Sequence, residues 1–305
     1  MKKCLVFVPQ FGNMLSTTTW LTTHALQTEL TQKSIQMAVS GISFPDIAEL
    51  RSIAATIWYD TMPDTDYLLF IDADMGFMPE MVLDMFLFDE PLVGAIYPQR
   101  RLPVSWAGSG NGEAQSERRG NFMRVEGVGM GCTLIHRSVL KTMLERMPEM
   151  VDLRLALHPA WSILQAQGAK RLIRCFEKLD LKERGVVSED LSFCLRWKQC
   201  GGQTWAAIGY RISHVGMFDY AGCYLEVTSQ QRAQEEAARK QVEMQTLTQG
   251  NYPIEPQMLP PQQQISGQPQ QIPIPPGNGQ DVTGAWGNTP LASSWTRHPP
   301  AEAAE

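Results

Sequence analysis

The run that most constrains the fold is Tyr67–Ile71, five apolar or aromatic residues that lead directly into two carboxylates, Asp72 and Asp74. A short continuous apolar run predicts a strand that is buried on both faces. Packing does not explain the two acids, because an unpaired buried carboxylate is costly. In open α/β sheets, ligands bind at the carboxyl ends of strands. The acids therefore predict a divalent metal ion holding a phosphorylated ligand at this strand end.

Strand and helix signals alternate through the first hundred residues. Asp46 is expected to cap one helix and Pro79 to open another at its first position. This alternation predicts an α/β fold, a Rossmann-like, mostly parallel sheet flanked by helices. The expected strands are 4–8, 36–39, 67–71 and 92–97, and the expected helices are 15–30, 47–59 and 79–88.

Composition narrows the class of protein. The 305 residues are 43% hydrophobic and 19% charged, as in an ordinary globular protein, and the net charge of −6 argues against a duplex nucleic-acid binder. No apolar stretch approaches the roughly 20 residues of a membrane helix, so a cytoplasmic location is expected, the host cytoplasm if a phage encodes the chain. The six cysteines form no C-x-x-C pair and are predicted to be buried and reduced.

Two further clusters carry titratable groups. Ser188, Glu189 and Asp190 open a strong helix, where Ser188 is expected to cap. Adjacent acids point in different directions, so one can face a cleft and serve as a general base. His214 stands beside a glycine near a strand end and is a candidate third metal ligand with Asp72 and Asp74; an imidazole shifts the preference from Mg²⁺ toward Mn²⁺.

Taken in order, these residues resemble the GT-A glycosyltransferases of the family-2-like type, particularly phage and bacterial members. The resemblance covers about residues 3–226. The matching segments are the Asp-x-Asp (DXD) stretch 69–74, then 93–98, the glycine run 127–131, the stretch 188–193, and 214–216.

The resemblance implies a nucleotide-sugar donor, a UDP- or GDP-sugar, held with Mn²⁺ or Mg²⁺. Asp74 matches the direct metal ligand and His214 the metal-binding histidine. Asp72 matches the acid that contacts the ribose or the metal. Pro9 would begin the loop that holds the nucleotide base, and Arg51 stands where a nucleotide-contacting basic residue is often found.

The resemblance also implies where the acceptor reacts. Glu189 and Asp190 match the acidic pair in which inverting members keep their base, and Asp190 is favoured for that role. Retaining enzymes share the metal site, so the stereochemistry stays open. Trp106 is a candidate for stacking on a sugar, although core packing is the stronger expectation for it. The acceptor could be a glycan, a protein or a modified nucleobase.

Two departures from the family pattern refine the expectation. The Q-x-x-R-W signature of processive synthases is absent and no membrane helix is expected, so a single sugar transfer is favoured. A sugar-nucleotide nucleotidyltransferase is an alternative, but the first loop, 9–13, has one glycine and no basic residue. A non-catalytic carbohydrate-binding or assembly protein is the third reading.

The chain is expected to have three parts: a catalytic domain over 1–227, a polar helix over 228–248 and a disordered tail over 249–305. The tail holds 11 of the 20 prolines and many glutamines, a composition that cannot bury a core. Trp286 and Trp295 could mediate a protein contact there. The basic pairs Arg100-Arg101 and Arg118-Arg119 could meet an anionic partner.

Overall fold

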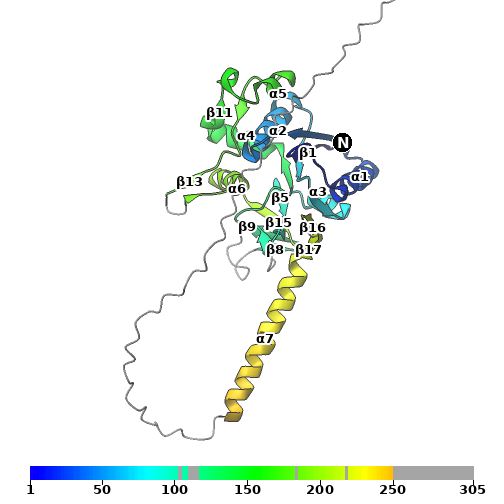
Figure 1. Cartoon of the computed structure of the whole chain (residues 1–305), viewed down its shortest axis with the longest axis vertical. Coiled ribbons are helices and arrows are strands. Elements are labelled where there is room, and N and C mark those ends of the chain that lie inside the picture. Colours follow the sequence, from blue (N-terminus) through cyan, green and yellow to red (C-terminus); the bar gives the residue numbers. More distant parts are fainter. Residues whose placement is uncertain (102–104, 109–116, 183–184, 217–218, 250–305) are drawn as a thin grey trace, which may run out of the picture. The chain divides into compact units, whose positions relative to one another are not determined.

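The predicted strand Tyr67–Ile71 forms β3, inside the main sheet of the protein. The whole fold is drawn in Figure 1. The computed structural model describes residues 1–101, 105–108, 117–182, 185–216 and 219–249. Residues Met1–Gly250 form one unit. The tail expected to be disordered, with Trp286 and Trp295, lies outside the described residues. The domain boundaries expected after 227 and 248 stay predictions.

The elements that build the fold are as follows. The helices are α1 (Thr17–Gln32), α2 (Ile47–Thr61), α3 (Pro79–Phe88), α4 (Arg137–Arg146), α5 (Trp161–Ala166), α6 (Glu189–Gln199) and α7 (Tyr224–Gln249), with short 3-10 turns η2 (Pro148–Met150) and η3 (Leu155–Leu157). The strands of the main sheet are β1 (Lys3–Gln10), β2 (Gln36–Ser43), β3, β5 (Leu92–Ala95), β8 (Arg118–Arg119), β9 (Phe122–Val125), β10 (Cys132–His136) and β15 (Thr204–Ala207).

In the described residues the main sheet has the strand order β2-β1-β3-β10-β5-β15-β9-β8. β1 pairs in parallel with both β2 and β3, and β5 pairs in parallel with β15. Only β10 and β9 run against the other strands of this sheet. The expected fold class, a mostly parallel α/β sheet flanked by helices, is therefore confirmed.

Side chains of β3 alternate between two cores. Leu68 and Phe70 face the core that contains side chains of α2, α4 and α6. Tyr67, Leu69 and Ile71 face the second core, which α1 and α3 cover. Successive side chains of a strand point to opposite faces, so an all-apolar run is what a strand between two helical layers requires.

Small sheets complete the fold beside the main sheet. One of them joins β4 (Met75–Phe77), β16 (Arg211–Val215) and β17 (Asp219–Cys223), and another pairs β6 (Tyr97–Pro98) with β7 (Trp106–Ala107). The remaining two-stranded pairs are β11 (Val151–Asp152) with β12 (Leu172–Ile173) and β13 (Asp180–Leu181) with β14 (Gly185–Val186).

Local signals explain the helix boundaries. The Ser16 hydroxyl accepts from Thr19 N (3.0 Å), and the Asp46 carboxylate accepts from Glu49 N (2.9 Å), so both side chains cap their helices. Pro79 occupies the first turn of α3, as predicted. Two expectations need correction: β2 continues to Ser43, and the 92–97 run divides into β5 and β6.

Two further findings bear on the expectations from composition. All six cysteines are free and buried, as predicted. Among the described residues, no helix has the length and apolar character needed to cross a membrane.

Candidate functional site

The acidic turn after β3 is held by contacts from three elements. Asp72 N donates to Gly131 O (3.0 Å), and Ser16 N donates to the carbonyl of the residue between the two acids (2.8 Å). Val215 N donates to Asp74 O (2.7 Å). These main-chain bonds fix the acids at the carboxyl edge of the sheet, where α/β proteins bind ligands.

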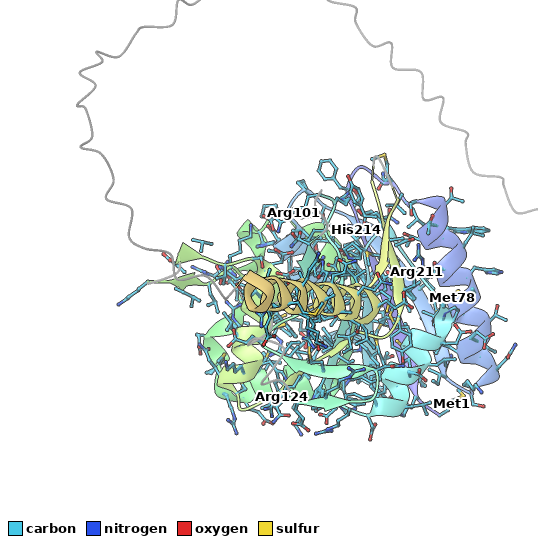
Figure 2. All side chains as sticks on the ribbon, turned by 90° about the horizontal axis from the view of Figure 1, so that it is seen from below. Met1, Met78, Arg101, Arg124, Arg211 and His214 are labelled. Carbon is cyan, nitrogen blue, oxygen red and sulfur yellow. The ribbon has the colours of Figure 1, made fainter. Side chains whose placement is uncertain are left out.

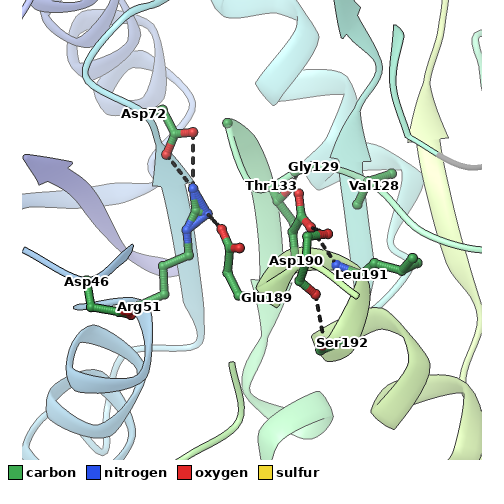
Figure 3. Close-up of polar contacts among 12 residues, drawn as sticks. Asp46, Arg51, Asp72, Val128, Gly129, Thr133, Glu189, Asp190, Leu191 and Ser192 are labelled. Atoms are coloured by element: carbon green, nitrogen blue, oxygen red, sulfur yellow. Dashed lines mark hydrogen bonds and ion pairs between the residues drawn. The ribbon is translucent and has the colours of Figure 1, made fainter. Parts of the chain in front are cut away.

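Asp72 is paired with a buried arginine (Figure 3). Nη2 of Arg51, on α2, lies 2.8 Å and 3.1 Å from the two carboxylate oxygens of Asp72. Nη1 of the same side chain lies 3.8 Å from Glu189 Oε1, at the start of α6. Arg51 therefore joins the acid after β3 to the first acid of α6.

Arg51 keeps its charge although its side chain is only 4% exposed. Burial opposes the charged form, but the carboxylates of Asp72 and Glu189 raise the pKa of the guanidinium above its ordinary value. Nε and Nη1 of Arg51 are buried, and no described group makes a hydrogen bond with them. These atoms are donors that a ligand or water can satisfy.

Asp74 faces a histidine and a second arginine. His214 Nε2 lies 3.5 Å from Asp74 Oδ1, and Arg100 Nη1 lies 3.0 Å from Asp74 Oδ2. His214 Nδ1 is 2.9 Å from Pro98 O, and a carbonyl can only accept, so Nδ1 carries a proton. Nε2 is the ring atom that faces Asp74 Oδ1, so the two side chains can share either a proton or a divalent cation between them.

The pKa of Asp74 reflects these neighbours. Partial burial pushes it upward, but the hydrogen bond and charge of His214, together with Arg100, hold the pKa below the ordinary value of a carboxyl. A carboxylate oxygen of Asp74 and Nε2 of His214 are both atom types that bind a divalent cation, which in nucleotide sites is held by few protein ligands plus phosphates and water.

The geometry differs from the three-ligand set expected from the sequence. In the described part of the chain, no group of three His, Cys, Asp or Glu side chains lies close enough to hold one metal ion. Asp72 and Asp74 diverge because the chain turns between them, with Met75 N donating to Asp72 O (3.2 Å). His214 meets Asp74 because β16 pairs His214 with Met75 of β4.

Tyr97 explains two glycines of the run 127–131 that the sequence analysis named. Its hydroxyl accepts from Gly131 N (3.2 Å), and its ring meets the His214 ring edge to face, with centroids 5.3 Å apart. A Cβ on Gly129 or Gly131 would lie 2.3 Å or 2.7 Å from Tyr97 atoms. The glycines make room for this ring. Burial, and then the charge of Asp72, raise the pKa of Tyr97, so its hydroxyl stays neutral.

Asp190 borders a small hollow beside this cluster. The hollow has a volume of about 190 Å³ and is lined by main-chain and side-chain atoms of Gln99, Ala107, Gly108, Gly127, Val128, Gly129, Ser188, Asp190 and Leu191. Asp190 Oδ1 accepts from Leu191 N (2.7 Å) and from the Ser188 hydroxyl. From the described residues, Oδ2 accepts no hydrogen bond, which leaves it for an acceptor hydroxyl.

One local expectation at α6 was wrong. Ser188 occupies the cap position, but its side chain makes no capping hydrogen bond to the helix. The hydroxyl donates to Asp190 instead. The adjacent acids diverge as expected: Glu189 turns to Arg51 and Asp190 turns to the hollow at Val128 (Figure 3).

The remaining candidates lie apart from these contacts. Pro9 is buried within β1, opposite Ile42, and the strand continues to Gln10 before the loop begins. Trp106 packs edge to face on Tyr224, with ring centroids 5.2 Å apart, so its described contact is with the core rather than with an open face. A larger hollow of about 340 Å³, between α2 and the segment 158–178, is lined by none of Asp72, Asp74, Glu189 and Asp190.

Sequence reasoning missed Arg100 as a site residue. It was considered only as part of a basic pair with Arg101 that could meet an anionic partner. The signal was present, because Arg100 closely follows β5 and β6 at the same sheet edge as Asp74.

Comparisons with known proteins give the following result. No protein-family model matches the chain, and no curated protein matches it. Among solved structures, it is similar to a protein from STIV, with 19% identity and a TM-score of 0.40, over 71% of this chain and 86% of that one.

It is also similar to a Drosophila β1,4-galactosyltransferase 7 mutant in complex with manganese, UDP-Gal and xylobiose, with 12% identity and a TM-score of 0.40, over 73% of this chain and 71% of that one. A glycosyltransferase involved in glycosylation of the major capsid of PBCV-1 matches with 13% identity and a TM-score of 0.27, over 53% of this chain and 73% of that one. Identities and TM-scores this low leave the function to be inferred from the site itself.

Proposed function

We propose that the protein is a metal-dependent glycosyltransferase that moves one sugar from a nucleotide-sugar donor to an acceptor hydroxyl. The observation that carries the proposal is the facing pair of potential metal ligands, Asp74 Oδ1 and His214 Nε2, 3.5 Å apart at the carboxyl edge of the sheet. The segment that holds His214 through Pro98 continues into Gln99, which lines the Asp190 hollow. A cation site and a candidate base thus share one wall.

Asp74 and His214 would hold Mn²⁺ or Mg²⁺, with the donor's diphosphate and water as further ligands. When bound, such an ion neutralises the negative charge that develops on the departing nucleoside diphosphate. The donor is a UDP- or GDP-sugar. Asp72, held by its ion pair with Arg51, contacts the ribose of the donor. The loop that follows Pro9 holds the nucleobase of the donor.

Asp190 is the proposed base. Its Oδ1 is fixed by Leu191 N and Ser188, so Oδ2 is oriented toward the hollow and takes the proton of the acceptor hydroxyl. Glu189 is engaged by Arg51 and holds the start of α6 in place. The acceptor oxygen then bonds to the anomeric carbon of the donor sugar as the bond from that carbon to the nucleoside diphosphate breaks, and a single displacement of this kind inverts the configuration. The acceptor is a glycan, a protein or a modified nucleobase.

The test is donor turnover with purified protein. The full chain is incubated with UDP- and GDP-sugars and Mn²⁺, and release of nucleoside diphosphate is measured. Asp74→Ala is expected to reduce release at least about a hundredfold, because the metal's charge stabilisation is worth several kcal/mol. His214→Ala is expected to raise the Mn²⁺ concentration needed for half-maximal release, while circular dichroism shows an unchanged fold.

Asp89→Asn is the matched control. Asp89 is an exposed acid that ends α3 with φ of 57°, a conformation that asparagine tolerates, and its carboxylate forms an ion pair with Lys2. Full turnover in Asp74→Ala would overturn the metal assignment. Release of pyrophosphate from a sugar phosphate and a nucleoside triphosphate would favour a nucleotidyltransferase, and absence of donor binding would favour a non-catalytic protein.

A further inference from the structure

Arg100 occupies the position next to the proposed metal ligand. Its Nη1 lies 3.0 Å from Asp74 Oδ2, while His214 faces Asp74 Oδ1. Its side chain is 51% exposed, in contrast to the buried Arg51. An exposed ion pair is weak and exchanges readily, because water solvates both partners. The guanidinium is therefore free to leave Asp74 when a better partner arrives.

The surroundings keep Arg100 at this place. Gln99 N donates to Ser105 O (2.7 Å), and the Ser105 hydroxyl donates to Gln99 Oε1 (2.8 Å), which fixes the backbone before Arg100. The side chain then lies across Gly216. A Cβ added there would be 2.9 Å from Arg100 Cδ. The glycine after β16 thus leaves the space that the arginine fills.

A divalent cation and a guanidinium compete for the same carboxylate. A metal held by Asp74 and His214 lies close to Oδ2 and repels a neighbouring positive charge. The metal also brings anionic oxygens of its own ligand to this place. A guanidinium forms paired, charge-assisted hydrogen bonds with phosphate oxygens. The arginine that the metal displaces therefore has a stronger acceptor within its reach.

We propose that Arg100 is a diphosphate-binding residue that rests on Asp74 until metal and donor arrive. It then transfers from the carboxylate to the phosphate oxygens of the donor. Metal and nucleoside diphosphate consequently bind cooperatively, since each removes the obstacle to the other. The inference rests on the proposed function and adds the residue that couples the metal to the donor.

The experiment measures the binding of Mn²⁺ alone, and of UDP or GDP with Mn²⁺, by titration calorimetry on the full chain. Arg100→Met removes the competitor, so Mn²⁺ alone is expected to bind about two- to fivefold more tightly, the range for an exposed ion pair. The same variant loses a charge-assisted contact, so the nucleoside diphosphate is expected to bind about tenfold or more weakly. Opposite shifts in one variant are the signature of the transfer.

Two further variants separate this signature from a general loss of charge. Arg101→Met removes an adjacent, exposed arginine whose side chain contacts Ser105. This variant is expected to change neither the Mn²⁺ affinity nor the nucleoside diphosphate affinity. Arg101 and His214 are both labelled in Figure 2. Gly216→Ala keeps the charge but displaces the Arg100 side chain, so it is expected to shift both affinities in the same directions as Arg100→Met, by less.

If Arg100→Met shifts the Mn²⁺ affinity and the nucleoside diphosphate affinity in the same direction, or changes neither, the inference is overturned. The proposed function still stands in that case, provided that the wild-type protein turns over a donor. A wild type that binds Mn²⁺ neither alone nor with a nucleoside diphosphate would overturn both. Equal affinities of Mn²⁺ with and without the diphosphate in the wild type would also overturn the coupling.

Discussion

Two arginines lie at opposite ends of β3, and the one at the amino end makes hydrogen bonds through all three nitrogens of its guanidinium. Arg137 follows β10, whose antiparallel pairing places His136 opposite the first residue of β3. Its guanidinium donates to four main-chain carbonyls at distances of 2.6–3.0 Å. The four carbonyls belong to Trp58, Tyr59, Met62 and Thr65.

Arg51, at the carboxyl end, is bonded in the opposite way. Its partners are the carboxylates of Asp72 and Glu189 rather than carbonyls, and its Nε and Nη1 make no hydrogen bond within the described residues. One end of the strand is closed by its own backbone, while the other keeps charge and open donors for a ligand. The comparison predicts a stabilising role for the first end and, under the proposed function, a ligand-binding role for the second.

Arg51→Met is expected to have the largest effect of the variants that test this difference between the two ends. Removing the guanidinium leaves Asp72 and Glu189 without their cation, so the free energy of unfolding is expected to fall by about 3 kcal/mol. Donor turnover per folded molecule is also expected to fall, because both acids lose their orientation. Urea unfolding and nucleoside diphosphate release measure the two effects.

Arg51→Lys is the matched variant for that prediction. Lysine keeps the charge but lacks the fork that reaches both carboxylates, so stability should recover in part while turnover stays low. If Arg51→Met turns over donor as fast as the wild type, after correction for the folded fraction, Arg51 has no role in turnover and forms only a structural ion pair.

Arg137→Met tests the other end and has the next largest expected effect. It removes the donors of four carbonyls and the contact of the guanidinium with the Trp58 ring, 4.9 Å from its centroid. The free energy of unfolding is expected to fall by about 2 kcal/mol. Turnover per folded molecule and Mn²⁺ affinity should stay at wild-type values. A loss of Mn²⁺ affinity would show that the two ends are coupled.

The sequence predicted the elements whose signals are local. The apolar run Tyr67–Ile71 and the proline at the start of α3 gave the bounds that the structure has. The direction of β10 could not be predicted, because an apolar run such as 132–135 looks the same in either direction. The two-residue strands of the segment 147–187 are too short to leave a periodic pattern.

The site was predicted in part for the same reason. Asp74 and His214, expected to share a metal ion, are brought together by the pairing of β16 with β4, which the sequence did not predict. The pairing of Asp72 with Arg51 was missed because it depends on the turn at Asp72–Met75 and on the packing of α2 against β3, which are tertiary features. Arg100 follows the strand expected over 92–97, which signals its place at the sheet edge, but nothing in the sequence signals that Asp74 is its partner.

The smallest expected effect concerns pH and the amino end of β3. Burial lowers the pKa of His136, with Lys2 and Arg137 lowering it further and Asp66 and Asp89 opposing. The folded chain thus binds a proton less readily than the unfolded chain, whose histidine titrates near pH 6.5, about the usual value. The contribution of His136 to the free energy of unfolding is therefore fully present above about pH 6.5, and it is lost as the pH falls below that value.

His136→Asn tests this without removing the helix cap. His136 Nδ1 accepts from Ser138 N (3.3 Å) at the start of α4, and asparagine caps helices well. Between about pH 7.5 and pH 5, the free energy of unfolding should fall more in the wild type than in the variant, since every other titrating group is common to both. Mn²⁺ affinity at the far end of β3 should be the same in the two proteins at pH 7.5. Parallel curves of unfolding free energy against pH would show that His136 titrates alike in the folded and unfolded chain. A difference in Mn²⁺ affinity between the two proteins would show that the amino end and the carboxyl end of β3 are energetically coupled.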